Sequence, residues 1–588
     1  MKSSPKMVSP PVSERSLVSV FAELHAREPL RELFVFVDDD GRDVERLTAR
    51  QLAGRADGVR ALLERERISP GDRVVLVHLP SLDFIAAFLG CLAAGVIPVP
   101  VSPPNPFRLE HDVALLSAIV DSSGARAMLT HAPYRDLVAA AASAPGGKTP
   151  AWPAIPWLCP DGSPAEPALA PDSWPAAVDL DEPAFLQYTS GSTGTPKGVM
   201  VTHRNIHHEL EALRIDLELD GDSVGVCWVP HFHDLGLISV LLTTLTGHAR
   251  TYLMSPLSFL KRPAVWFEVL SRVRGTHTTA PNFAFDLMAR KVTPEQRAAW
   301  DLSSVRVLCS GGEIVQPAAM ERFFAEYKST GLGREAFRPG YGLAEHTLSV
   351  SMGTGGPLTL DRGELERGWA VPVDDPSDRR TAVFYGSGWV TKAGAKVRII
   401  DPATFRPCER NQIGEIWIDS PTKARGYWGR ESDSRETFEA VPTDGDQGRY
   451  LRTGDLGFLR DGELFVTGRL KDLIILYGHN YAPEDIESSV RRSDQRIRRG
   501  GVAAFSVPPV PGESAVERLV VFAETTLTDP ADEIVAEIVR AIRRQVHADQ
   551  GLVCDDVVVA NNLVLKTSSG KVRRTACRDR YLSKEPAL

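Results

Sequence analysis

The first half of the chain alternates short runs rich in branched apolar residues with longer segments of helical pattern. Strand-like runs at residues 73–79, 96–101 and 125–130 are separated by helix-like segments at residues 81–95 and 111–124. Such alternation is typical of βαβ units, in which a helix connects two parallel strands of one sheet. The sequence therefore predicts an α/β fold with a largely parallel sheet in this half.

One stretch inside this alternation, residues 84–101, is uncharged over its whole length. It reaches the length of a membrane-spanning helix. Pro98 and Pro100 would break such a helix, because proline lacks the backbone N–H and disfavours helical geometry before it. We therefore expect a buried helix that leads into a strand, and no membrane span.

The second half of the chain has a different pattern. Between residues 396 and 468 short strands follow one another with turns between them, which indicates an antiparallel β subdomain. From about residue 471, strands at 501–507 and 518–526 precede an amphipathic helix at 531–549. This last segment is typical of a small α+β domain.

Charge and cysteine content exclude several classes of function. The 588 residues carry 67 Lys and Arg against 76 Asp and Glu, a net charge of −9, so the overall field gives no reason to bind nucleic acid or an anionic membrane. Any anionic ligand must be held by local groups. The seven cysteines show no C-x-x-C pair, which excludes a zinc ribbon and a disulfide framework. We expect a reducing, cytoplasmic location.

The most informative string is YTSGSTGTPKG at residues 188–198. Its glycines allow close backbone approach, and its hydroxyls and N–H groups are donors that can surround phosphate oxygens. Lys197 adds positive charge, but Gly198 follows it where a Walker loop has a magnesium-binding Ser or Thr. Taken without its context, such a loop could equally be a flexible Gly/Ser hairpin.

The whole string resembles the phosphate-binding signature of the adenylate-forming superfamily, which contains acyl-CoA synthetases, luciferases and peptide-synthetase adenylation domains. Four further segments resemble its motifs in the expected order: YGLAE at 341–345, TGD at 453–455, GRLKD at 468–472 and SGK at 569–571. The resemblance implies that a carboxylic acid attacks the α-phosphorus of ATP and expels pyrophosphate. Because two anions must meet, the site needs positioned positive charge.

The resemblance also implies a domain organisation. A large N-terminal domain, residues 1–470, would contain two α/β subdomains and a β-rich subdomain. A small α+β domain, residues 471–588, would carry the catalytic lysine and rotate about a hinge at Lys471 between the two half-reactions.

Roles for individual residues follow from the resemblance. Lys571 would bridge the substrate carboxylate and the α-phosphate, although a solvated basic tail is the alternative for a K-x-R-R string. Glu345 would bind Mg²⁺. Tyr341 would stack on adenine, Asp455 would accept the ribose hydroxyls, and Arg469 would donate to ribose or phosphate. The expected nucleotide-binding residues are Thr189, Ser190, Gly191, Ser192, Gly194, Lys197, Gly311, Gly312, Glu313, Tyr341, Gly342, Asp455 and Arg469, and the expected catalytic residues are Lys571, Glu345, Thr193 and His233.

Within the superfamily, the chain resembles the fatty acyl-AMP ligases. The segments that carry this resemblance are residues 228–242, 255–266, 279–287, 426–438 and 477–487. An apolar acyl tunnel beside the phosphate loop is implied, for which the lining candidates are Leu235, Ile238, Phe283, Phe285 and Met288. Each of these alone is also an ordinary core residue.

The resemblance further implies an acyl acceptor. Fatty acyl-AMP ligases carry an insertion, here about residues 352–389, that is thought to disfavour CoA, so that a separate holo acyl carrier protein receives the acyl group. The insertion ends here in FYGSGW, a departure from the usual pattern that leaves its effect on CoA open. The alternatives are a ligase that uses free CoA and an enzyme for an aryl or other unusual acid.

Two histidine groups suggest metal binding at first sight. His203 and His207 share one face of a predicted helix, and His231 and His233 lie in the string HFHD. Neither group follows a known zinc pattern. We expect His233 to lie near the carboxylate and phosphate, and we expect no metal site other than that of Glu345.

Overall fold

The computed structural model describes residues 14–105, 109–142, 150–160, 174, 178–189, 196–374, 381–390, 394–476, 479–508, 517–567 and 570–583. Among the helices of these residues, none combines the length and the apolar character that a membrane span requires.

The largest sheet has eight strands in the order β14-β13-β12-β11-β9-β10-β1-β2. Its six central strands pair in parallel, and the two edge strands are antiparallel to their neighbours. This is the largely parallel arrangement that an α/β fold requires, although the parallel strands extend well beyond the half in which the sequence pattern is clearest. The strands are β1 Glu32–Val37, β2 Asp43–Thr48, β9 Ser223–Cys227, β10 Ala249–Met254, β11 His277–Ala280, β12 Val307–Ser310, β13 Phe337–Gly342 and β14 Ser349–Met352.

Both faces of this sheet are buried, as in most parallel sheets. Successive side chains on a strand point to opposite faces. On β12, Leu308 therefore packs in a core with α10, α11 and α13, whereas Val307 packs in another core with α6 and the π-helix η3. The helices near this sheet are α6 His203–Asp216, α7 Asp234–Gly236, η3 Leu237–Leu242, α8 Thr243–Leu245, α9 Pro256–Lys261, α10 Ala264–Arg272, α11 Asn282–Lys291, α12 Pro294–Ala298 and α13 Pro317–Glu326.

A second sheet, in the order β4-β3-β5-β6, is parallel throughout and confirms the βαβ prediction. The uncharged stretch forms buried helix α3 and then strand β4, as predicted. Gly90 lets α2 approach α3 closely, because a Cβ there would lie 2.6 Å from the carbonyl oxygen of Ala56. The elements are α1 Leu17–Arg27, α2 Ala49–Arg65, β3 Arg73–Val77, α3 Asp83–Ala93, β4 Ile97–Pro100, α4 Leu109–Ser123, β5 Ala127–Thr130, α5 Ala132–Ala142 and β6 Trp157–Leu158.

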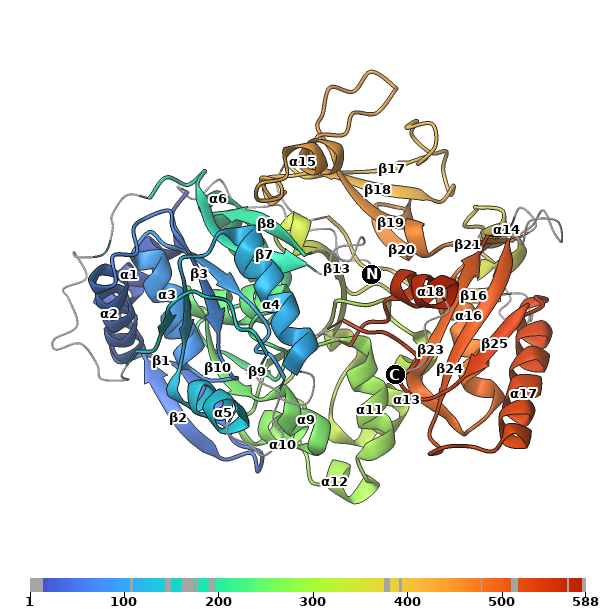
Figure 1. The fold of residues 1–588 in the computed structure, drawn as a ribbon, viewed down its shortest axis with the longest axis horizontal. Helices are drawn as coiled ribbons and strands as arrows, with labels where there is room; N and C mark the ends of the chain where they lie inside the picture. The colour runs from blue at the N-terminus through green and yellow to red at the C-terminus, as the bar shows by residue number, and fades with distance from the viewer. Residues whose placement is uncertain are drawn as a thin grey trace.

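The β-rich part is an antiparallel sheet in the order β17-β18-β19-β20, as predicted, and it lies above the two α/β sheets in Figure 1. A separate antiparallel hairpin, β7–β8, flanks the phosphate-loop string. The elements are β7 Pro183–Thr189, β8 Lys197–Thr202, η6 Ala344–His346, β15 Pro357–Asp361, α14 Arg362–Glu366, β16 Thr381–Tyr385, β17 Lys396–Ile400, β18 Gly414–Asp419, α15 Glu431–Phe438, β19 Leu451–Arg460 and β20 Glu463–Arg469.

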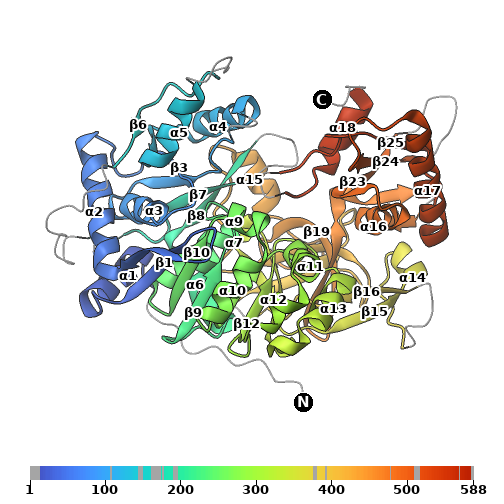
Figure 2. The same ribbon diagram turned by 90° about the horizontal axis from the view of Figure 1, so that it is seen from below.

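The C-terminal part is an α+β unit, as predicted, with its own three-stranded sheet β23-β24-β25. Figures 1 and 2 both show α17 at its outer edge, away from the rest of the chain. Its apolar clusters are built from residues 474–581. The elements are η7 Leu470–Asp472, β21 Ile474–Leu476, β22 His479–Tyr481, α16 Pro483–Ser493, β23 Ile497–Val507, β24 Arg518–Thr525, α17 Asp532–Gln550, β25 Asp556–Val559 and α18 Arg574–Ser583.

Candidate active site

A cavity of about 1050 Å³ lies where the N-terminal sheets, the β-rich part and the C-terminal part meet. It is lined by segments that are far apart in the sequence, from β7 near its first third to the loop before α18. Thirteen of the residues singled out from the sequence line it together: Thr189, Lys197, His233, Leu235, Gly311, Gly312, Tyr341, Gly342, Glu345, Asp455, Arg469, Lys471 and Lys571.

The β7–β8 hairpin brings the ends of the phosphate-loop string to the cavity. Thr189 ends β7 and is paired with Lys197, which begins β8. The Lys197 Nζ lies 2.9 Å from Asp433 Oδ2 and 4.7 Å above the ring of Tyr427. The predicted residues between the two strands, namely Ser190, Gly191, Ser192, Thr193 and Gly194, lie outside the described residues.

One wall of the cavity is formed by β13 and the β19–β20 hairpin. The Tyr341 hydroxyl donates to Asp455 Oδ2 at 2.8 Å, and burial raises the pKa of Tyr341 well above its usual value. Arg469 pairs with Asp455 across the hairpin, with Nε 3.1 Å from Oδ1. A planar ring, a carboxylate and a guanidinium therefore lie side by side on one wall, where they can face a base and a ribose.

The turn after Tyr341 brings Glu345 to the same cavity. Gly342 is needed there, because a Cβ would lie 1.9 Å from the carbonyl oxygen of Leu348. The Glu345 carboxylate, on the short helix η6, accepts a hydrogen bond from the Tyr427 hydroxyl at 2.9 Å. Burial raises the pKa of Glu345 above its usual value.

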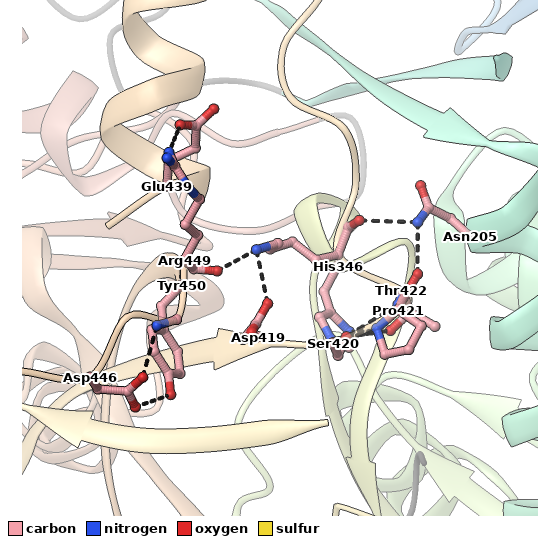
Figure 3. Close-up of polar contacts among 12 residues, drawn as sticks. Asn205, His346, Asp419, Ser420, Pro421, Thr422, Glu439, Asp446, Arg449 and Tyr450 are labelled. Atoms are coloured by element: carbon pink, nitrogen blue, oxygen red, sulfur yellow. Dashed lines mark hydrogen bonds and ion pairs between the residues drawn. The ribbon is translucent and has the colours of Figure 1, made fainter. Parts of the chain in front are cut away.

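A polar network holds η6 against the β-rich part (Figure 3). The His346 ring lies 2.6 Å from Ser420 Oγ, and the Asn205 amide donates to the carbonyl oxygen of Pro421 at 2.9 Å. The Thr347 hydroxyl donates to the carbonyl oxygen of Thr422 at 2.7 Å. The segment after β18 is thereby bonded both to α6 and to the turn that carries Glu345, which fixes the position of this carboxylate.

The third group of polar residues faces the middle of the cavity. His233 Nδ1 lies 2.5 Å from Asp234 Oδ1, which also accepts the Leu235 N–H at 2.7 Å. Burial alone would raise the pKa of Asp234, but the charges of His233 and Lys571 hold it below its usual value. Burial within the cavity lowers the pKa of Lys571, and Asp234 partly opposes this effect.

Lys571 is presented by a tight hairpin that begins at Thr567. The Thr567 N–H donates to the Lys571 carbonyl oxygen at 2.8 Å, and the Lys571 N–H donates to the Thr567 hydroxyl at 3.1 Å. Arg574, one helical turn further on, lies 2.7 Å from Glu487, 2.8 Å from Glu484 and 3.1 Å from Asp472. This guanidinium ties the lysine hairpin to the segment that follows β20.

Beyond Leu235 the cavity wall is largely apolar, and we call this part the apolar arm. Only Leu235 of the five candidates lines it. Phe285 and Met288 are fully buried with α10 and α13, on the opposite face of the main sheet, because α11 packs there. Ile238, on η3, is buried in the core, and Phe283 is 40% exposed.

Glu313 was also expected in the nucleotide slot. Unlike Gly311 and Gly312, it does not line the cavity. Its Oε1 instead accepts the backbone N–H of Phe283 at 2.5 Å, which ties the start of α11 to the loop after β12.

Sequence reasoning missed two groups of cavity residues. Tyr427 and Thr437 lie inside the segment 426–438 that resembles the ligases, so a signal existed, but no role was assigned to them. The walls of the apolar arm come from single positions on several strands and helices, which no local string reveals. They include Leu213, Leu217, Gly225, Cys227, Ser239, Val240, Thr243, Thr244, Thr251, His277, Val307 and Cys309.

No group of three or more His, Cys, Asp or Glu side chains in the described parts of the chain could hold a metal ion. The histidines on α6 therefore form no such group with any described residue. Glu345 is one of several carboxylates in the cavity wall, with Asp234 and Asp455 among the others.

Comparison with known proteins identifies the family. Residues 21–428 match the model of the AMP-binding enzymes. The chain is 38% identical to JamA of Moorena producens, a medium-chain-fatty-acid–[acyl-carrier-protein] ligase, over 94% of this chain and 92% of the relative. It is 36% identical to FadD28 of Mycobacterium tuberculosis, a long-chain-fatty-acid–AMP ligase, over 97% and 98%.

Comparison with solved structures supports the same family assignment. The structure is similar to the fatty acyl-adenylate ligase of L. pneumophila, solved in complex with acyl adenylate and pyrophosphate, with a TM-score of 0.72, 35% identity and 96% of each chain covered. This agreement confirms the predicted adenylate-forming fold, and family membership implies that ATP is the nucleotide substrate. The chain therefore belongs to the AMP-binding enzymes and, among them, to the fatty acyl-AMP ligases.

Proposed function

We propose that the protein uses ATP to convert a fatty acid into an acyl-adenylate and pyrophosphate, and then transfers the acyl group to the phosphopantetheine thiol of an acyl carrier protein. One observation carries this proposal. A single cavity joins the wall formed by Tyr341 and Asp455 to an apolar arm that begins at Leu235. Lys571 lines the same cavity.

In the first half-reaction, a carboxylate oxygen of the acid attacks the α-phosphorus of ATP, and the bond to pyrophosphate breaks. The Lys571 ammonium would offset the repulsion between these anions and hold them in line. Lys197 and His233 face the same cavity and are assigned to the phosphate and carboxylate groups. Thr193 is proposed to contact phosphate on the basis of its motif.

Tyr341 is proposed to stack on the adenine, with Asp455 and Arg469 at the ribose. The Tyr341–Asp455–Arg469 contacts arrange these groups before any ligand is present, so little reorganisation accompanies binding. Gly311 and Gly312 would form the opposite side of the nucleotide slot.

Glu345 fits the role of a magnesium ligand. Mg²⁺ is commonly held by one or two carboxylates, water and substrate phosphates rather than by a cage of protein ligands. Glu345 lines the cavity together with Lys197 and Lys571, so its carboxylate could supply one such ligand beside bound phosphates. Bound there, the ion would neutralise charge on the phosphate oxygens, and the Tyr427 hydroxyl would orient the carboxylate.

In the second half-reaction, the thiol sulfur attacks the acyl carbonyl, a thioester forms, and AMP leaves. We assign residues 1–470 to an ATP- and acyl-binding domain and residues 471–588 to a mobile domain that turns at Lys471. The apolar clusters formed within residues 474–581 support a unit able to move as one body. A relative named as an acyl-carrier-protein ligase supports this acceptor, and free CoA is the alternative. The seven free cysteines support a reducing, cytoplasmic location.

The test is acid-dependent pyrophosphate release with a panel of acids, followed by product analysis with holo carrier protein or CoA. Lys571→Ala should lower pyrophosphate release by about 10²- to 10³-fold, because a positioned charge is lost at the reacting groups. Lys566→Ala removes a lysine from the same hairpin that does not line the cavity, and it should change the rate less than about threefold. Unchanged release by Lys571→Ala would contradict the mechanism, and preferential acyl-CoA formation would contradict the acceptor.

A further inference from the structure

The apolar arm runs along the inner face of the main sheet and crosses a row of three residues on adjacent strands. Thr251 on β10 and His277 on β11 are both paired with Gly225 on β9, so the three side-chain positions share one face. All three line the cavity. In the middle of the row the glycine leaves a gap.

Hydrogen bonds tie the two flanking residues to the helices above the sheet. Thr251 Oγ1 lies 2.7 Å from Thr244 Oγ1, next to η3. His277 Nε2 donates to the carbonyl oxygen of Leu217, at the end of α6, over 2.7 Å. We call the Thr251–Thr244 contact the threonine pair and the His277–Leu217 contact the histidine pair. The two pairs form walls on either side of Gly225.

These walls offer no polar group to a substrate. His277 Nδ1 lies 2.7 Å from the Thr276 hydroxyl, so both ring nitrogens are engaged. Burial lowers the pKa of His277 to about 4, so the ring is neutral at physiological pH. The passage between the pairs is therefore suited to an alkyl chain, despite its threonines and histidine.

Glycine in the interior of a strand is unfavourable and often marks close approach of a ligand. A Cβ added at Gly225 would lie 3.0 Å from Thr251 Oγ1 and would occupy the gap. The cavity continues beyond the row to Ala249, whose partner Ser223 lies one step further on the same face of β9. The gap over Gly225 thus connects two parts of the arm.

The position of the row sets which acids reach it. His277 is paired with Val307, the first residue of β12, and Gly311, at the proposed nucleotide end, lies four residues further along the chain, just after β12. Four residues of strand span about 13 Å. A short acid therefore ends before the row, whereas a long acid must pass over Gly225.

We propose that Gly225, between the threonine and histidine pairs, is the aperture that determines acyl chain length and shape. It selects acids with long, straight tails that thread between the pairs, and it excludes tails branched at that depth. The proposal rests on the function proposed above and specifies the substrate class of the same site.

Gly225→Ala tests the aperture directly. We compare kcat/KM for pyrophosphate release with hexadecanoate and with hexanoate. One methyl group in the gap should lower the hexadecanoate-to-hexanoate ratio about tenfold, the usual effect of one carbon in a tight apolar pocket. The matched control is Val224→Ala, the preceding residue on β9, which does not line the cavity and should leave the ratio within twofold.

A second variant distinguishes a blocked passage from a damaged sheet. The three atoms nearest to the added Cβ all belong to Thr251, and truncation of that residue would leave its own Cβ at 3.6 Å, an ordinary contact. Gly225→Ala combined with Thr251→Ala should therefore recover most of the hexadecanoate activity. Thr251→Ala alone should widen the passage and raise kcat/KM for a methyl-branched acid relative to hexadecanoate.

The outcomes separate the two proposals. If no acid supports pyrophosphate release by the unmodified protein, the proposed function fails and the aperture fails with it. If release occurs but Gly225→Ala leaves the ratio unchanged, or if Val224→Ala lowers it equally, only the aperture is contradicted. Failure of the double variant to recover the long acid also contradicts it.

Discussion

Glu345 and Asp234 face the same cavity, yet their environments affect their pKa values in opposite directions. Burial raises the pKa of Glu345, and the Tyr427 hydroxyl only partly offsets it. At Asp234 the charges of His233 and Lys571 outweigh burial. Asp234 is therefore kept ionised beside the lysine, whereas Glu345 gains its proton more readily when no cation is present.

This difference predicts an acid limb in the pH dependence of the reaction. A magnesium-binding Glu345 must be deprotonated, so activity should fall as the pH drops through its raised pKa. Tyr427→Phe removes a hydrogen bond that lowers this pKa, so the pKa rises further and the acid limb of kcat/KM should move to higher pH. Activity lost in this way should recover in part at higher Mg²⁺ concentration.

Tyr450→Phe is the matched control for this prediction. It removes a tyrosine hydroxyl that donates to Asp446 at 2.8 Å, away from the cavity (Figure 3). Its pH profile should match that of the unmodified protein. An acid limb that does not move in Tyr427→Phe would show that Glu345 does not control it.

At the scale of elements, the β13–β14 connection depends on one close contact. The chain reverses after Tyr341 and returns so near that Leu348 leaves no room for a side chain at Gly342. The tyrosine precedes this turn and the glutamate lies within it, on η6. The relative position of two site residues is thus set by backbone packing rather than by contacts between their side chains.

Gly342→Ala should therefore reduce both stability and activity. Displacing the Leu348 carbonyl group costs about 1–3 kcal/mol, as other overpacked sites do, and the displacement moves Tyr341 and Glu345 apart. Thermal unfolding should show a lower Tm, and KM for ATP should rise. Gly356→Ala is the control, because a Cβ there meets no atom within 4 Å. Equal Tm values for the two variants would contradict this account.

Local patterns predicted many elements, but not the face on which each one packs. The two prolines after α3 ended that helix and gave β4, as expected from their chemistry. The apolar face of α11 was equally visible in the sequence, yet Phe285 and Met288 point into the core on the far side of the sheet. The apolar residues of a helix show that one face is buried. They do not show on which side of the sheet the helix packs, because that depends on the path of the chain between the elements.

For the molecule as a whole, polar contacts link the C-terminal part to the rest of the described chain. Arg362, in the segment proposed as the family insertion, donates to Gln550 Oε1 at 2.7 Å and lies 3.3 Å from Asp485. Arg499 lies 3.6 Å from Asp286 on α11. These contacts hold the C-terminal part where Lys571 faces the cavity.

Weakening the first of these contacts should affect the choice of acceptor. If the insertion disfavours CoA by restraining the C-terminal part, Arg362→Ala should raise the ratio of acyl-CoA to acyl-adenylate. The increase should be no more than about fivefold, because a partly exposed ion pair contributes at most about 1 kcal/mol. Chromatography of the products formed with CoA measures this ratio.

Arg367→Ala is the control within the same segment. Arg367 pairs with Glu364 at 2.6 Å and makes its ion pair inside the insertion. It should leave the product ratio unchanged. A similar rise in both variants would point to general loosening of the insertion instead of its contact with the C-terminal part.

Site residues that belong to a sequence motif can be predicted from the sequence more readily than isolated residues that line the cavity. Tyr341, Asp455 and Lys571 stand in short strings with a recognisable order, and the structure brings all three to one cavity. Thr251 and Gly225 each contribute a single position on a separate strand, and their meeting depends on strand order and register. The domain boundary near Lys471 stays a prediction, because it concerns motion between two arrangements.

The apolar arm lies between the main sheet and α6, in the place where a folded protein normally keeps its own side chains. This part of the interior is lined as a cavity, and Gly225 contributes no side chain to fill it. A bound tail completes the packing. The fatty acid is thus a structural component of the enzyme that processes it, and substrates that fill the arm more fully should also hold the fold together more strongly.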